Sequence, residues 1–343
     1  MSLSRTTPDD DDVISSMPEN VVSNILDRLP IQDAVGTSIL SKTWRFKWTL
    51  LTQLIFDYEK DYDEGDINRL LLQLKGPITN FDLCIPDDTV LDVKSINHWV
   101  MFLSGKGIQE FTLTNNHETS LRLPTHLFSC MELKHLTLSN CCFRITPSFC
   151  GFPNLLTLHF FQITFESGNC GQLITQCPLL ENLEISYRHD LSRKLKLAEI
   201  AKLKNLIVLS LPLCNLDYKV ITLSKIHQLV SCFPRLQELC LDFQNCKFPT
   251  ESNENDCLIF NSFPSLKTLT LSQINLGRHV VFISCMGSQY EIYLIKHLLA
   301  CSPLLKKMAI HSVSSMSYAG KLKVATTLLK LNRASHTAIV DFN

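Results

Sequence analysis

The chain has 343 residues, 45% hydrophobic and 19% charged, enough for one large domain and a small additional module. Its formal net charge of -1 gives no bulk electrostatic reason to expect a nucleic acid or an anionic membrane as partner. No apolar run approaches the about 18 residues of a membrane span, and the polar start MSLSRTTPDDDD lacks the apolar region of a secretory signal.

The cysteine content indicates reduced thiols. Fourteen cysteines occur without a C-x-x-C pair and without a secretory signal, so a disulfide framework is not expected. The sequence also has no N-x-S/T sequon, which agrees with a cytoplasmic or nuclear location.

In chain order, residues 1–14 are polar and acidic and are expected to form a disordered tail. The next stretch predicts an amphipathic helix that Pro30 ends, because its apolar residues recur at helical spacing. Those residues are Val21, Val22, Ile25, Leu26 and Leu29. Two further short helices are expected, one over 32–40 and one capped by Ser41. A unit below about 40 residues usually needs a staple or a partner, so another protein should cover part of this apolar surface.

From Met17 to Trp48 the residues MPENVVSNILDRLPIQDAVGTSILSKTWRFKW resemble an F-box, in particular that of plant F-box/FBD/LRR-repeat proteins. The F-box of that family docks on the Skp adaptor of a cullin-based (SCF) ubiquitin ligase. The resemblance implies an adaptor-binding face formed or buttressed by Pro18, Ile25, Leu26, Leu29, Pro30, Val35, Leu40 and Trp44. Met17 departs from the usual leucine, and Gly36 and Thr43 stand where relatives often carry arginine. The alternative is an ordinary helical hairpin that caps the domain behind it.

An internal repeat then determines the expected architecture. The pattern L-x-x-L-x-L, with other apolar residues allowed, begins at Ile78, Ile108, Leu133, Leu155, Leu180, Leu206, Leu236, Leu266 and Leu305. Most steps fall in or just beyond the leucine-rich-repeat range of about 20–29 residues. One such unit cannot bury its apolar face, but stacked units share a continuous core under a curved parallel sheet.

Prolines support this register, because a proline ends the preceding helix and turns the chain into the next strand. They stand two residues before five of the repeats, at Pro153, Pro178, Pro234, Pro264 and Pro303. Helices are expected before several of them, over 172–177, 226–232 and 292–301. Six cysteines at repeated positions are expected to be core thiols without a ligand or catalytic role. They are Cys130, Cys141, Cys177, Cys214, Cys232 and Cys301.

The expected fold class is therefore α/β: an N-terminal helical F-box, a leucine-rich-repeat solenoid with a curved parallel sheet, and a C-terminal cap. The expected bounds are 1–14 for the tail, 15–60 for the F-box, 61–304 for the solenoid, and 305–343 for the last repeat and cap. The segments SPLLKKMAIHS and GKLKVATTLLKLNRASHTAIVDF resemble the FBD region and predict a strand, a helix and a short strand over 338–342.

The non-leucine positions of each strand should line the concave face, since successive side chains point to opposite faces of a sheet. The candidate target-binding residues on this face are His159, Phe161, Glu184, Tyr187, Glu238, Asp242 and Phe243. The aromatics are candidate anchors. Acids outnumber the single lysine, which argues against nucleic acid and phosphate-rich cofactors on this face.

No G-x-G-x-x-G, P-loop, H-E-x-x-H or G-x-S-x-G motif is present, so no enzymatic activity, cofactor or metal is expected. The resemblance implies a substrate-recognition subunit: the F-box binds the Skp adaptor, and through it cullin, while the repeats bind a target protein for ubiquitination. Two alternatives remain open. One is a small-molecule sensor in which Phe161, Tyr187 and Phe243 line a pocket, and the other is an interaction scaffold that acts without the ligase.

Overall fold

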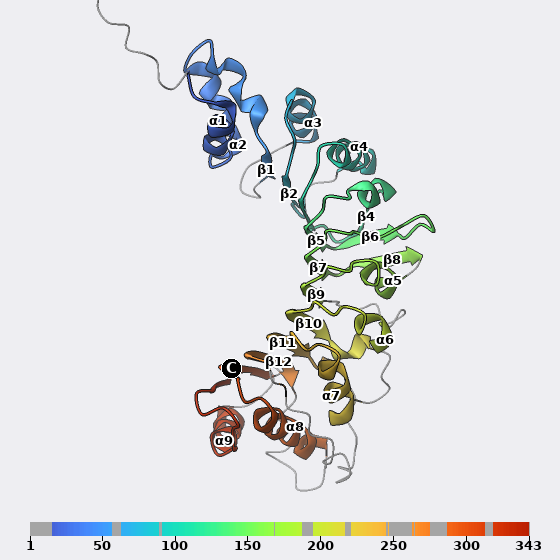
Figure 1. Cartoon of the computed structure of the whole chain (residues 1–343), viewed down its shortest axis with the longest axis vertical. Coiled ribbons are helices and arrows are strands. Elements are labelled where there is room, and N and C mark those ends of the chain that lie inside the picture. The colour runs from blue at the N-terminus through green and yellow to red at the C-terminus, as the bar shows by residue number, and fades with distance from the viewer. Residues whose placement is uncertain are drawn as a thin grey trace, which may run out of the picture.

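One long parallel sheet organises the chain. The computed structural model describes residues 16–56, 63–88, 91–167, 169–186, 195–216, 221–244, 246, 263, 265–274, 287–312 and 318–342, so the expected tail lies outside it. Within these ranges an eleven-stranded sheet has the order β1-β2-β3-β5-β7-β9-β10-β11-β12-β13-β14, and each strand pairs parallel with its neighbour. Figure 1 shows an arc with the strands on its inner side and most helices on its outer side.

Each of the nine predicted repeats supplies one strand, which begins two residues after its first apolar position. These strands are β2 (Asn80–Ile85), β3 (Glu110–Asn115), β5 (His135–Ser139), β7 (Thr157–Phe161), β9 (Asn182–Ser186), β10 (Val208–Pro212), β11 (Glu238–Asp242), β12 (Thr268–Ile274) and β13 (Lys307–Ser312). The predicted curved parallel sheet is confirmed.

The sheet also has a strand at each end beyond these nine. β1 (Gln53–Phe56) pairs with β2. The repeat motif occurs here once more, and its apolar positions are Leu51, Leu54 and Phe56, which are all buried. The sequence analysis did not include this repeat. At the other end β14 (Ile339–Phe342) pairs with β13, which confirms the short strand expected over 338–342.

Equivalent apolar residues stack from strand to strand and form the core. One row runs Leu136, Leu158, Leu183, Leu209, Leu239, Leu269 and Met308, each at most 2% exposed. Fully burying one such side chain is worth about 1.5–3 kcal/mol. The stacking therefore stabilises every repeat through its two neighbours.

Helices return the chain along the outer side. They are α3 (Glu64–Gln73), α4 (Val93–Ser104), η3 (Thr125–Ser129), α5 (Cys170–Ile174), α6 (Leu197–Ile200), η4 (Leu213–Asn215), α7 (Leu223–Ser231), α8 (Gly287–Cys301) and α9 (Tyr318–Leu329). The helices expected over 172–177, 226–232 and 292–301 overlap α5, α7 and α8. None of the described helices has the length and apolar character to span a bilayer.

A small second sheet lies on the outer side of the arc (Figure 1), with the order β4 (Leu121–Arg122), β6 (Cys141–Arg144) and β8 (Thr164–Ser167). Tight turns lead into β6 and towards β8. Asn140 and Gln162 take positive φ angles of 52° and 55° there, and the Asn140 side chain donates to the His117 carbonyl oxygen at 2.6 Å.

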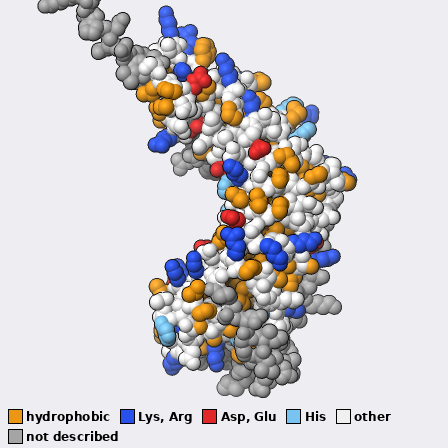
Figure 2. All heavy atoms as spheres, in the orientation of Figure 1, with side chains coloured by type: hydrophobic (Ala, Val, Ile, Leu, Met, Phe, Trp, Pro, Cys, Tyr) orange, Lys and Arg blue, Asp and Glu red, His pale blue; other side chains and the backbone are white. Residues whose placement is uncertain are grey.

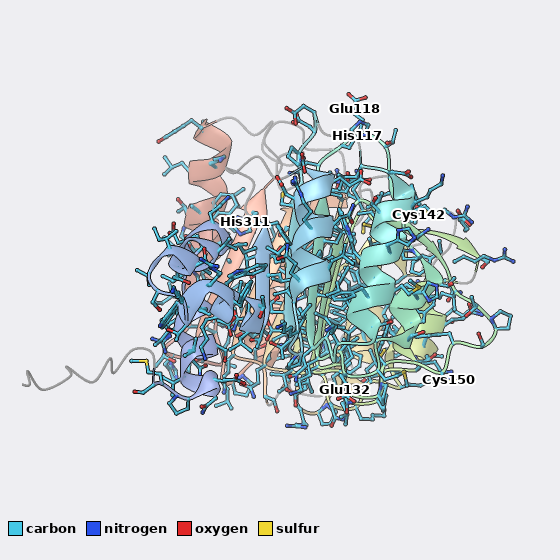
Figure 3. All side chains as sticks on the ribbon, turned by 90° about the horizontal axis from the view of Figure 1, so that it is seen from above. His117, Glu118, Glu132, Cys142, Cys150 and His311 are labelled. Carbon is cyan, nitrogen blue, oxygen red and sulfur yellow. The ribbon has the colours of Figure 1, made fainter. Side chains whose placement is uncertain are left out.

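The twelve cysteines of the described residues are free thiols. Burial raises the pKa of Cys130 to about 12 and that of Cys177 to about 11. Burial also raises the pKa of Cys141 to about 12, with a smaller contribution from the neighbouring Cys142. Cys150, labelled in Figure 3, is exposed at the periphery of the molecule.

Candidate interaction surfaces

Short helices form a module at the N-terminal end of the arc (Figure 1): α1 (Glu19–Leu26), α2 (Ile31–Gly36), η1 (Thr37–Ile39) and η2 (Trp44–Leu50). The second and third expected helices are partly or wholly 3-10 in geometry. Thr43, not the predicted Ser41, takes the N-cap position of η2, but Ser41 Oγ accepts the backbone N–H of the first helical residue, Trp44, at 3.2 Å. The inner side of the module joins the same apolar core as the first strands of the sheet.

Asp27 fastens this module to the sheet. Its carboxylate accepts hydrogen bonds from the Thr52 backbone N–H at 2.8 Å, the Thr52 hydroxyl at 2.6 Å and the Gln53 backbone N–H at 3.2 Å. Hydrogen bonds to a charged group contribute about 1.5–3 kcal/mol each when partly buried. The end of α1 is therefore tied directly to the start of β1.

The eight predicted adaptor-binding residues divide by burial. Leu26 and Trp44 are 0% and 4% exposed and belong to the core of the module, where they can only support a face. Val35 is half-buried. The exposed members are Pro18, Ile25, Leu29, Pro30 and Leu40.

Three exposed apolar residues of the module were not among the predicted site residues. Val21 is 40% exposed, Phe46 is 63% exposed and Ile39 is 87% exposed. Together with Ile25, Leu29 and Leu40 they form what we call the exposed apolar group. Figure 2 shows hydrophobic side chains gathered on this end of the molecule. Sequence reasoning had a signal for Val21, because it stands four residues before Ile25 on the same helical face.

Two further details of the module concern its stability. A Cβ atom added to Gly36 would meet no heavy atom within 4 Å, and the residue has right-handed helical angles. Among the described residues, the buried Trp44 Nε1 is the side-chain polar atom without a hydrogen-bond partner. The packing of Trp44 therefore includes one unsatisfied donor.

On the concave face the structure brings together three of the predicted target-binding residues. His159 on β7 lies opposite Glu184 on β9, with 4.0 Å between His159 Nε2 and Glu184 Oε2. The rings of His159 and Phe161 have centroids 6.3 Å apart. All three side chains are partly exposed, so they form a small mixed surface of an aromatic ring, an imidazole and a carboxylate.

A second group lies further along the same face. Cys240 pairs in register with Ser210 and Thr270, and burial raises its pKa although hydrogen bonds from Ser210 and Ser272 oppose the rise. Burial also raises the pKa of Asp242. Glu238, at the start of the same strand, is exposed.

Phe243 does not lie on this face, so its predicted placement was wrong. Its side chain is 3% exposed and belongs to the core. The strand ends at Asp242, whose carboxylate accepts the Gln244 backbone N–H at 2.9 Å. Phe243 continues the alternation of Leu239 and Leu241, whose side chains face the core, so its burial agrees with the strand pattern. Tyr187 lies outside the described residues.

Most concave strand positions that the structure describes are neutral, and among the charged side chains there acids outnumber bases. The acids are Asp82, Glu110, Glu184, Glu238, Asp242 and Asp341, against the single basic residue Lys307. That lysine already has an acidic neighbour, with 3.9 Å between Lys307 Nζ and Asp341 Oδ2. The predicted excess of acids over lysine on this face is confirmed.

A helical module fused to the first strand of a parallel repeat sheet is the arrangement of an F-box/leucine-rich-repeat protein. The sequence model of the F-box domain matches residues 14–53. The model described as "FBD-associated F-box protein At5g56370, LRR repeats" matches residues 96–219.

Three relatives from Arabidopsis thaliana show how far the similarity extends. F-box/FBD/LRR-repeat protein At1g13570 is 38% identical over 193 residues, 51% of this chain and 44% of that protein. Putative F-box/FBD/LRR-repeat protein At5g52460 is 28% identical over 96% of both chains. F-box protein At4g09920 is 30% identical over 62% of this chain and 70% of that protein. The chain belongs to the plant F-box/FBD/LRR-repeat family.

Proposed function

We propose that the chain is the substrate-recognition subunit of an SCF-type ubiquitin ligase. The observation that carries this proposal is the exposed apolar group on an F-box module whose core takes Val22, Leu26, Ile31, Ala34, Trp44 and Trp48. Large exposed apolar side chains gathered on a surface mark protein interaction sites. The family of the module identifies the expected partner as the Skp adaptor and, through it, cullin.

In this proposal the concave face binds the target protein. Its acidic character favours a target with a basic segment, because complementary charge steers association and disfavours like-charged partners. His159, Phe161 and Glu184 provide an anchor surface at one point of the face, and Asp242 with Glu238 provides a second acidic point.

The proposal assigns no catalytic residue to the chain. Its contribution to ubiquitination is proximity, since binding two proteins on one rigid body raises the effective concentration of one at the other. It places the chain in the cytoplasm or nucleus, where free thiols persist.

Co-purification with the Skp adaptor tests the proposal. We expect Leu40→Ala combined with Phe46→Ala to lower adaptor affinity at least about tenfold, equivalent to about 1.4 kcal/mol. Both side chains are exposed, so circular dichroism and the unfolding temperature should stay unchanged. Leu72→Ala is the matched control, because Leu72 is 82% exposed on α3, outside the F-box module.

Unchanged adaptor binding by the double variant would overturn the assigned face. A folded wild-type chain that never binds the adaptor would overturn the ligase role and favour the scaffold alternative. The sensor alternative loses one of its three aromatic residues, because Phe243 belongs to the core.

A further inference from the structure

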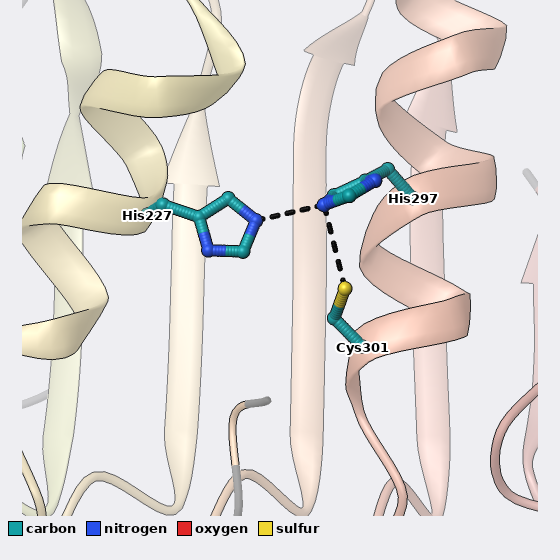
Figure 4. Close-up of side chains that lie close together, drawn as sticks. All are labelled: His227, His297 and Cys301. Carbon is teal, nitrogen blue, oxygen red and sulfur yellow. Dashed lines mark hydrogen bonds between the residues drawn. The ribbon is translucent and has the colours of Figure 1, made fainter. Parts of the chain in front are cut away.

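Three side chains that the proposed function does not use meet inside the C-terminal half of the solenoid. Figure 4 shows His227 from α7 facing His297 and Cys301 from α8. The Nε2 atoms of the two histidines are 2.8 Å apart, and Cys301 Sγ lies 3.3 Å from His297 Nε2. The three residues are 7–8% exposed, and one potential ligand atom from each lies within 4.8 Å of the others.

The fold explains this meeting. His297 and Cys301 stand four residues apart on α8, so they share one face of the helix. His227 is 70 residues earlier in the chain and reaches them because stacked repeats place α7 near α8. The Phe263 ring packs against His227, with 4.8 Å between centroids, and the Phe263 backbone N–H donates to the Cys301 carbonyl oxygen.

The protonation states of the two histidines suit metal ligands, whereas burial raises the pKa of the Cys301 thiol, so metal binding must drive the loss of its proton. Burial lowers the pKa of His227, and burial together with the neighbouring His227 lowers the pKa of His297 to about 4. Both imidazoles are therefore neutral near pH 7 and keep a nitrogen lone pair for coordination. Without a metal, hydrogen bonds satisfy the same atoms, with one of the two Nε2 atoms carrying the proton.

We infer that His227, His297 and Cys301 form a binding site for a divalent transition-metal ion of the Zn²⁺ class. Two imidazole nitrogens and one thiolate are donors that Zn²⁺ takes in proteins, and three protein ligands leave a fourth position for water. This assignment gives Cys301 a ligand role, in contrast to the core-thiol role expected from its repeat position.

The geometry needs a small adjustment. Tetrahedral Zn²⁺ with bonds of about 2.0 Å to nitrogen and 2.3 Å to sulfur holds its ligand atoms roughly 3.3–3.6 Å apart. The two imidazole nitrogens must therefore separate by about 0.5 Å, and the ligand atoms of His227 and Cys301, which lie within 4.8 Å of each other, must come to about 3.5 Å. On binding, the Cys301 thiol releases one proton to solvent as the metal–sulfur bond forms, and His227 carries its proton on Nδ1.

Such a site fastens α7 to α8. These helices precede β11 and β13, so the metal links repeats on either side of β12. A cross-link between residues this distant in the chain removes much of the conformational freedom of the unfolded state. The concave strands β11 to β13 would then be held in register from the outer side.

Cobalt substitution of the purified full chain tests the inference. After removal of metal by a chelator, Co²⁺ titration should give thiolate-to-cobalt charge transfer and intense tetrahedral visible absorption, saturating near one ion per chain. Cys301→Ser should abolish the thiolate band. Cys177→Ser is the matched control, because Cys177 is also a buried thiol near a helix end, and this variant should keep the band.

A second readout does not depend on variants. Zn²⁺ should raise the unfolding temperature of the chelated wild-type chain, whereas Mg²⁺ should not, because a ligand that binds only the folded state stabilises it. No charge-transfer band in the wild-type chain, an equal band in Cys301→Ser, or equal effects of Zn²⁺ and Mg²⁺ would each overturn the site. If Cys301→Ser fails to fold, His227→Asn replaces it as the test variant. Loss of the tetrahedral absorption in this variant would support the site, and an unchanged absorption would overturn it. Adaptor binding plays no part in either readout.

Discussion

The two ends of this molecule use apolar residues in opposite ways. In the solenoid the repeated leucines are buried by their neighbours, and the polar residues that alternate with them form the accessible concave face. In the F-box the core takes Val22, Leu26, Trp44 and Trp48, while other large apolar side chains such as Ile39 remain exposed. Binding capacity therefore lies in polar residues on the repeats and in apolar residues on the F-box.

The largest effect on stability should come from substitution of Trp44, because this residue belongs to the core of the F-box and not to its exposed apolar group. Trp44→Ala should lower the free energy of unfolding of the module by about 3–5 kcal/mol, because it empties a buried site. Trp44→Phe should cost much less, since it also removes the unsatisfied Nε1 donor. Chemical denaturation followed by fluorescence of the remaining tryptophans measures both. Equal losses in the two variants would contradict the burial of Trp44.

Thiol reactivity should distinguish the packed repeats from their periphery. The pKa of Cys141 is raised from 9.0 to about 12, so its thiolate fraction below pH 9 is roughly a thousandfold lower than that of an ordinary cysteine. Cys150, which is exposed, should react first with an alkylating reagent at pH 8, and Cys141 only after unfolding. Mass spectrometry of timed samples gives the order. Early labelling of Cys141 would mean that the repeat opens locally.

A smaller effect is expected at Gly36. Alanine there should raise the free energy of unfolding by about 0.5–1 kcal/mol, because it lowers the conformational entropy of the unfolded chain and its Cβ atom meets no neighbouring atom in the folded chain. Adaptor affinity should not fall. Thermal unfolding of Gly36→Ala beside the wild-type chain measures the gain, and a loss of stability would show that the helix end needs glycine.

The repeat strands could be predicted because every unit carries the same leucine spacing and so repeats its own signal. β1 was missed because its motif, Leu51 to Phe56, lies inside the bounds expected for the F-box, 15–60, although Leu51 precedes Ile78 by 27 residues, a step within the repeat range. The placement of Phe243 was wrong because it did not follow the alternation: Asp242 and Phe243 are adjacent and cannot both face the concave side, and Phe243 shares the core-facing positions of Leu239 and Leu241. The His227, His297 and Cys301 cluster was invisible in the sequence, since only the stacking of repeats brings α7 and α8 together.

The attachment of Asp27 to Thr52 and Gln53 has a geometric consequence. Because the F-box is hydrogen-bonded to the first strand and shares one core with the repeats, we expect the described parts of the F-box and the sheet to move together. Eleven strands at about 4.8 Å each span roughly 50 Å along the sheet. The strand to which a target protein binds would therefore set the distance between that target and the partner of the F-box. That distance would determine which lysines of the target lie close enough to be modified.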